Sequence, residues 1–123
     1  MHRLLITGLV AVFAFASSVV AQEEPAEVAP GGVVRVLDKL TGSHIDLTLQ
    51  SGETGRLGYL SVTLKECRYP QENPSGDAYV ALEVHYRDEP APAFEGWMLA
   101  SSPALNAMDH QRYDVWALRC ITS

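Results

Sequence analysis

The sequence lacks the short motifs that mark several common enzyme sites. It contains no Cys-x-x-Cys pair and no Gly-x-Ser-x-Gly, which are typical of dithiol redox proteins and of α/β-hydrolases. Gly52, Gly55 and Gly58 are evenly spaced, but their pattern is not that of a phosphate-binding loop, and hairpin turns account for them. These absences argue against thiol redox, α/β-hydrolase and nucleotide-binding functions.

Basic residues are also scarce. The chain has 9 Lys and Arg against 15 Asp and Glu, a formal net charge of −6 at pH 7. This balance argues against nucleic acid and anionic membrane surfaces as partners. A length of 123 residues is too short for a TIM barrel, which needs about 250. The hydrophobic fraction of 47% nevertheless excludes a wholly disordered chain.

The longest apolar run lies at the N-terminus and resembles an export signal. Arg3 precedes the apolar residues 4–15, and small side chains follow up to Ala21. The alternative is a retained membrane anchor, but the 18 residues from Leu4 to Ala21 fall short of the roughly 20 that span a bilayer. We expect residues 1–21 to be a cleaved signal peptide, the mature protein to be periplasmic, and no stable membrane anchor to remain.

The next segment, residues 22–32, has the composition of a linker. It contains three glutamates and two prolines and ends in Gly-Gly, which leaves little to bury. We therefore predict a disordered acidic linker over residues 22–32 and a single β domain over residues 33–123.

Short segments of alternating polarity, separated by turn residues, predict an all-β fold. In residues 44–49, for example, Ile45, Leu47 and Leu49 share one face of a half-buried antiparallel strand. The expected architecture is a small antiparallel sandwich or barrel of about six strands. The predicted strands are residues 33–37, 44–49, 57–67, 78–86, 94–100 and 113–120.

One short helix is predicted near residues 103–109. Ser102 is a suitable N-cap, and Pro103 suits the first helical position, where its missing N–H costs nothing.

The two cysteines, Cys67 and Cys120, are expected to form a disulfide. Exported proteins enter an oxidising compartment, and two thiols without a third most simply pair. Two free buried thiols or a redox pair are the alternatives. Cys67 falls on the polar face of its predicted strand, so we expect either a β-bulge nearby or a position at the rim of the sheet.

Aromatic residues and methionines gather in the last third of the chain. Trp residues can close the small core, and they can also form a binding hot spot beside polar loops. The candidate binding residues are Trp97, Met98, Ser101, Ser102, Asp109, His110, Tyr113, Asp114 and Trp116.

Two enzymatic alternatives use residues of types that support catalysis. A hydrolase would need Ser101 or Ser102 as nucleophile, His110 as base and Asp114 to orient it. A metal site would combine polar side chains from two strands, namely His44, Asp46, Glu83 and His85. Neither pattern is specific, so we assign no catalytic residue, no metal ligand and no cofactor.

The strings GWMLASSPALNAMDH (residues 96–110) and YDVWALRC (residues 113–120) resemble one known family. VRVLDKLTG and LSVTLKECRYP extend the similarity toward residue 33. The family comprises small exported proteins of alphaproteobacteria, catalogued as domain of unknown function 2155. The resemblance implies a periplasmic location and paired cysteines at Cys67 and Cys120, and it implies no activity.

These observations together favour a monomeric binding or accessory module of the cell envelope. Its expected partner is an envelope protein or a cell-wall component, contacted through the segment from Trp97 to Trp116.

Overall fold

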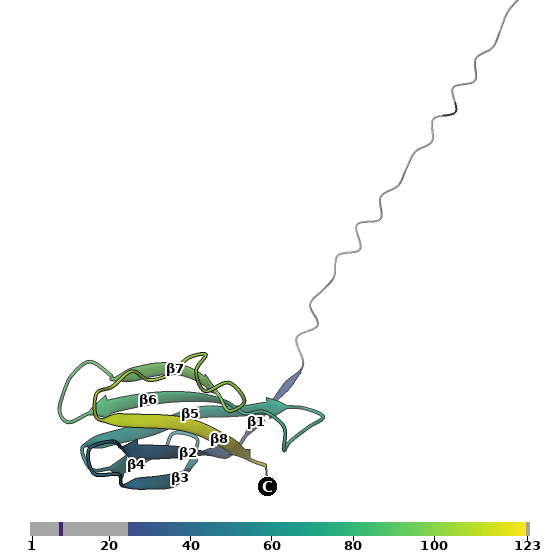
Figure 1. The fold of residues 1–123 in the computed structure, drawn as a ribbon. Coiled ribbons are helices and arrows are strands. Elements are labelled where there is room, and N and C mark those ends of the chain that lie inside the picture. Colours follow the sequence, from purple (N-terminus) through teal and green to yellow (C-terminus); the bar gives the residue numbers. More distant parts are fainter. Residues whose placement is uncertain (1–7, 9–24, 123) are drawn as a thin grey trace, which may run out of the picture.

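The structure is a computed structural model that describes Gly8 and residues 25–122. The described residues form eight strands and no helix (Figure 1). The all-β class is therefore confirmed. The strands are β1 (Ala26–Ala29), β2 (Gly31–Asp38), β3 (His44–Gln50), β4 (Thr54–Leu57), β5 (Leu60–Pro70), β6 (Tyr79–Tyr86), β7 (Phe94–Leu99) and β8 (Tyr113–Ile121).

The strands form two antiparallel sheets that pack as a sandwich (Figure 1). Sheet A has the order β1-β5-β6-β7, and β4 pairs with the first part of β5 on the same side as β1. Sheet B has the order β3-β2-β8. Each sheet therefore has an inner face toward the core and an outer face toward solvent.

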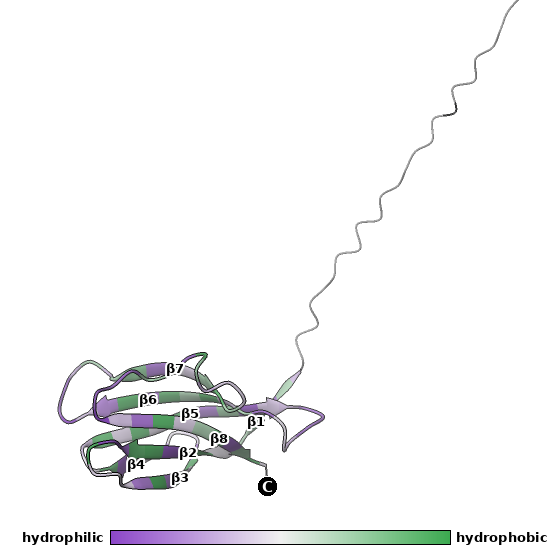
Figure 2. Cartoon of the chain, in the orientation of Figure 1, coloured by the Kyte–Doolittle hydropathy of each residue, from purple (hydrophilic) through white to green (hydrophobic). Residues whose placement is uncertain are grey.

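The core lies between the sheets and follows the alternation of each strand (Figure 2). Val62 on β5, Val84 on β6 and Val36 on β2 are fully buried, whereas their chain neighbours point outward. The apolar face of β3 is less covered, because β3 is an edge strand, and Ile45 near its start is 42% exposed. Alternation thus sets which side chains enter the core.

The predicted linker is wrong over its described part. Residues 26–29 form β1, which pairs with the end of β5, and Ala29 is buried opposite Cys67. After Pro30 the chain passes to sheet B and continues as β2. An added Cβ at Gly32 would lie 3.0 Å from the Sγ atom of Cys67. The glycines therefore permit close packing between the sheets rather than flexibility.

The predicted helix at residues 103–109 is also wrong. A single turn forms instead, in which the Leu105 N–H donates to the Ser102 carbonyl at 3.0 Å with Pro103 between them. Proline favours the second position of such a turn. Of residues 103–109 only Met108 is buried, so a helix here would have no apolar face to pack.

A β-bulge explains why Cys67 is buried although the alternation of its predicted strand places it on the polar face. The register between β5 and β6 shifts between Leu64 and Glu66, which leaves Lys65 as the extra residue. The shift turns Cys67 inward, where it is fully buried and bonded to Cys120 of β8. Both the predicted disulfide and the predicted bulge are confirmed, and the disulfide joins sheet A to sheet B.

The predicted signal peptide lies outside the described residues except for Gly8, and so do residues 22–24 of the predicted linker. In the part of the chain that the structure describes, no helix is long and apolar enough to cross a membrane.

We predict that reduction strongly destabilises the protein. The bond closes a chain separation of 53 residues, for which loop-closure entropy gives about 4 kcal/mol. In a domain of this size that corresponds to a fall in melting temperature of about 15 °C or more. Thermal unfolding followed by circular dichroism, with and without dithiothreitol, measures the change. The Cys120→Ala variant is the control and should not respond to the reductant. An equal melting temperature of the wild type in both buffers would contradict the prediction.

Candidate functional site

The structure places the two tryptophans on opposite outer faces of the sandwich. Trp97 lies on β7 of sheet A beside the buried Met98, and it is 40% exposed. Trp116 lies on β8 of sheet B between the buried Val115 and Ala117, and it is partly exposed. The two indoles do not share one surface, although only 19 positions separate them in the chain.

Several other candidates belong to the core or to the loop that joins β7 to β8. Met98 and Tyr113 are buried and offer no surface to a partner. Tyr113 instead accepts a hydrogen bond at its Oη from the Tyr59 N–H, at 3.1 Å. Ser102 and Asp109 are exposed on the loop.

Ser101 anchors this loop to the carboxylate of Asp77, a residue that the sequence analysis does not single out. The Ser101 Oγ donates to Oδ2 of Asp77 at 2.6 Å, and the Ser101 N–H donates to Oδ1 at 3.0 Å. Partial burial alone raises the pKa of Asp77, but the hydrogen bonds from Ser101 and Ala78 outweigh it, so the pKa lies below its usual value. Asp77 therefore remains ionised and holds the loop in place.

His110 is held by the backbone rather than by a catalytic partner. Its Nδ1 atom accepts hydrogen bonds from the N–H groups of Arg112 and Tyr113, at 3.0 and 3.1 Å. Nδ1 must then be unprotonated, and Nε2 carries the proton of the neutral ring. Asp114 forms an ion pair with Lys39, at 3.7 Å. The structure therefore does not assemble Ser101 or Ser102 with His110 and Asp114.

The four residues of the metal hypothesis are likewise separated. His44 and Asp46 lie on the outer face of sheet B, where Asp46 forms a bidentate pair with Arg35. Glu83 and His85 lie on the outer face of sheet A and contact each other at 3.0 Å. Within residues 25–122, no group of three or more His, Cys, Asp or Glu side chains could hold a metal ion.

The outer face of sheet A carries a continuous band of large side chains around Trp97. A row of directly paired residues crosses β1, β5, β6 and β7, from Val28 through Arg68 and Tyr79 to Leu99. Trp97 lies beside this row, and the Arg68 guanidinium stacks 5.4 Å from its ring centroid. We call these five residues the Trp97 surface. Val28 is 60% exposed, so the apolar area extends onto β1.

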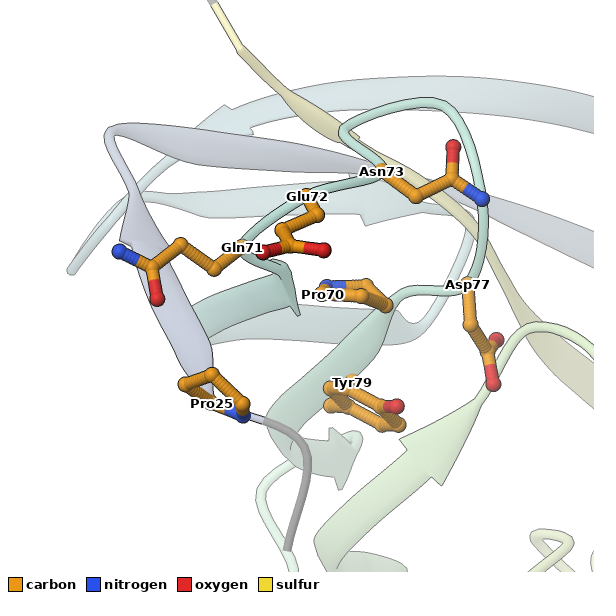
Figure 3. Close-up of a pocket in the computed structure, with 7 residues that line it drawn as sticks. All are labelled: Pro25, Pro70, Gln71, Glu72, Asn73, Asp77 and Tyr79. Atoms are coloured by element: carbon orange, nitrogen blue, oxygen red, sulfur yellow. The ribbon is translucent and has the colours of Figure 1, made fainter.

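A shallow hollow of ≈ 530 Å³ opens at one end of the Trp97 surface (Figure 3). Tyr79 belongs to both and forms one wall together with Pro70, while Glu72 and Asp77 contribute carboxylates. In Figure 3 the Tyr79 ring lies below the Pro70 ring, with Pro25 to its left and Asp77 to its right. The hollow adds carboxylate and amide groups to a band that otherwise consists of apolar and aromatic side chains and Arg68.

At the other end of the fold, a buried ion pair joins β2 to the segment that precedes β8. Arg112 donates two hydrogen bonds to Asp38, at 3.0 and 3.2 Å, and Asp38 is only 5% exposed. The hydrogen bonds from Arg112 lower the pKa of Asp38 from 3.8 to about 2, and they outweigh burial, which by itself would raise this pKa. The pair holds Tyr113 at the start of the last strand.

Comparison with known proteins gives a family match over nearly the whole domain. Residues 32–120 match the model of the family described as "Uncharacterized protein conserved in bacteria (DUF2155)". The chain belongs to this family. The similarity noted in the sequence is thereby confirmed, and it covers seven of the eight described strands of this DUF2155 protein.

A relative occurs in Rickettsia prowazekii (strain Madrid E), under the name "Uncharacterized protein RP359". It is 27% identical over 92 residues, which cover 72% of the DUF2155 protein and 59% of the relative. The chain thus spans less than two thirds of the relative's length. No solved structure matches the chain.

We predict that the ion pair makes stability fall at low pH. Asp38 is ionised in both states above its unfolded pKa of 3.8, so its contribution is complete there. It is lost as the pH falls from about 4 to about 2, because the unfolded chain binds the proton first. Asp38→Asn should lower the melting temperature at pH 7 and flatten its decline below pH 4.

The measurement is thermal unfolding from pH 7 to pH 2, with Asp46→Asn as the matched control. Asp46 also forms a bidentate pair, but that pair is exposed, so its loss should cost less at neutral pH. An acid profile of Asp38→Asn that parallels the wild type would contradict the role of the pair.

Proposed function

We propose that this DUF2155 protein is an exported periplasmic binding module that docks on a protein of the cell envelope through the Trp97 surface. The proposal rests on one observation. Trp97 is 40% exposed and lies in a band with Arg68 and Tyr79 on the outer face of a rigid sheet. Trp, Tyr and Arg are the residue types that dominate protein-binding hot spots.

The geometry favours a preformed surface. The four strands fix the positions of the side chains, and the stacked Arg68 restricts the Trp97 ring before any partner arrives. Asn106 also donates a hydrogen bond to the Trp97 carbonyl at 2.7 Å, which holds the β7–β8 loop beside the surface. A preorganised surface loses little conformational entropy on binding, so more of the contact energy appears as affinity.

The charge of the surroundings favours a partner with basic residues around an apolar centre. Glu66, Glu83 and Glu95 lie on the same outer face. Lys65 contacts Glu83 and Glu95 at 3.7 and 2.6 Å, and Arg68 contacts Glu66 at 3.0 Å. The three carboxylates outnumber these two cations, and the protein as a whole has a net charge of −6.

Replacing Trp97 should abolish most of the binding. Removal of a hot-spot side chain costs 2 kcal/mol or more, which is about 30-fold in affinity. A photocrosslinking amino acid at Leu99 would capture the partner in intact cells, and the affinity of that purified partner for Trp97→Ala and wild type would then be measured.

Trp116→Ala is the matched control, because it removes the same side chain from the opposite face. The proposal requires an unchanged affinity for Trp116→Ala and a large loss for Trp97→Ala. A loss of affinity for Trp116→Ala alone would contradict the proposal and indicate a binding site on sheet B. Crosslinks to cell-wall glycan instead of protein would refute the protein partner.

If the protein is exported as proposed, we predict a mature chain with a defined N-terminus. Cleavage after Ala21 leaves a chain that begins at Gln22, since signal peptidase requires a small residue at this position. Ala21→Tyr should accumulate as the uncleaved form, whereas the conservative Ala21→Ser should be processed normally. Intact mass measurement of the protein from a bacterial periplasmic fraction distinguishes the forms. A wild-type protein that retains Met1–Ala21 would contradict the prediction.

A further inference from the structure

A second hollow lies where β4 turns into β5 and β6 ends, away from the Trp97 surface. It measures ≈ 330 Å³. Two arginines line it, one from β4 and one from the turn after β6, together with the two-residue hairpin Gly58–Tyr59 and a serine hydroxyl. The lining residues are Arg56, Gly58, Tyr59, Leu60, Ser61, Arg87 and Asp88.

Arg87 adopts a backbone conformation that is unusual for its type. Its φ is 53°, and among the described residues it is the only one besides glycines with a positive φ. Such a conformation favours glycine or asparagine and costs free energy for a long side chain. Its N–H donates to the Tyr59 carbonyl at 2.8 Å, so the turn is fixed on the hairpin. An arginine at this position therefore points to a use for its side chain.

The Arg87 guanidinium is held in place without being neutralised. It lies 4.4 Å from the ring centroid of Tyr59 and 5.3 Å from that of Tyr86, and its Nε donates to the Tyr86 Oη at 3.1 Å. In the part of the chain that the structure describes, no carboxylate pairs with it. Arg112 also lies over Tyr59, at 5.4 Å, but it is bound to Asp38.

Arg56 supplies a second free cation on the same hollow. Its register partner is Ser61, whose Oγ makes only a long 3.5 Å hydrogen bond to the His85 carbonyl. Arg56 likewise has no ion pair among residues 25–122. Asp88 is exposed and contributes one negative charge, so the hollow keeps a net positive charge in a protein whose net charge is negative.

We propose that this hollow is a binding site for an oxyanion, the carboxylate or phosphate group of a ligand. The two terminal nitrogens of Arg87 can donate in parallel to two oxygens, since the guanidinium fork matches that geometry. Stacking on Tyr59 and the bond to Tyr86 orient the fork in advance, and Arg56 and Ser61 provide further donors from the sheet. This site shares no residue with the Trp97 surface, so the two proposals can be tested separately.

The test uses the disulfide-bonded full domain, titrated with sodium phosphate and, separately, with sodium acetate. Sodium chloride at matched ionic strength is the baseline, and ¹H–¹⁵N NMR shifts are the readout. Saturable shifts of the Gly58, Tyr59 and Arg87 amides are expected with one anion or both, and the stronger response identifies phosphate or carboxylate as the preferred group.

Arg87→Gln should raise the Kd at least tenfold, and Arg87→Lys should also weaken binding because lysine keeps the charge and loses the fork. Arg119→Gln, on the outer face of sheet B, is the control for charge alone and should leave the Kd unchanged. Arg87→Gly separates the backbone from the side chain: glycine accepts the positive φ, so the turn should be retained, while binding should be lost.

Three outcomes would overturn the site. These are shifts that do not saturate with either anion, shifts that chloride reproduces at the same ionic strength, and a Kd that Arg87→Gln leaves unchanged.

Discussion

The disulfide between Cys67 and Cys120 is the constraint on which the rest of the fold depends. It cross-links the two sheets in addition to the chain segments that connect them, and Gly32 of β2 lies so close that an added Cβ would be 3.0 Å from the Cys67 Sγ atom. The disulfide also requires the bulge at Lys65, because without the register shift Cys67 would point away from β8. A domain of this size has a small core, and such domains commonly rely on a covalent link for stability.

The two proposed sites make different use of sheet A. The Trp97 surface lies over β1, β5, β6 and β7 and offers apolar and aromatic area, so it suits a macromolecular partner. The Arg87 hollow lies at the hairpin end of the sheet and offers charge in a fixed orientation, so it suits a small anionic group. Neither site draws on sheet B, which leaves the surface around Trp116 without an assigned role.

Much of the fold was predictable because strand periodicity depends on local sequence alone. Alternation located six of the eight described strands, and the parity of Cys67 predicted either a bulge or a position at the sheet rim, of which the bulge is present. β1 was missed because its glutamate and flanking prolines resemble a linker, and only the long end of β5 gives it a partner. The separation of Trp97 from Trp116 could not be predicted, since alternation shows which way a side chain points within a sheet but not which sheet the strand joins. Arg87 carried no sequence signal, because its positive φ follows from the turn packed on Tyr59.

The strand order of sheet B also determines when the domain can be completed. β2 is the central strand of that sheet, and one of its two partners, β8, is the last of the described strands. Until β8 emerges from the ribosome, one edge of β2 has no hydrogen-bonding partner, and the apolar Val34 and Val36 are only partly covered. An uncovered apolar strand edge is prone to pair with other chains. The order of the strands therefore leaves one edge of β2 open to pairing with other chains until β8 is available.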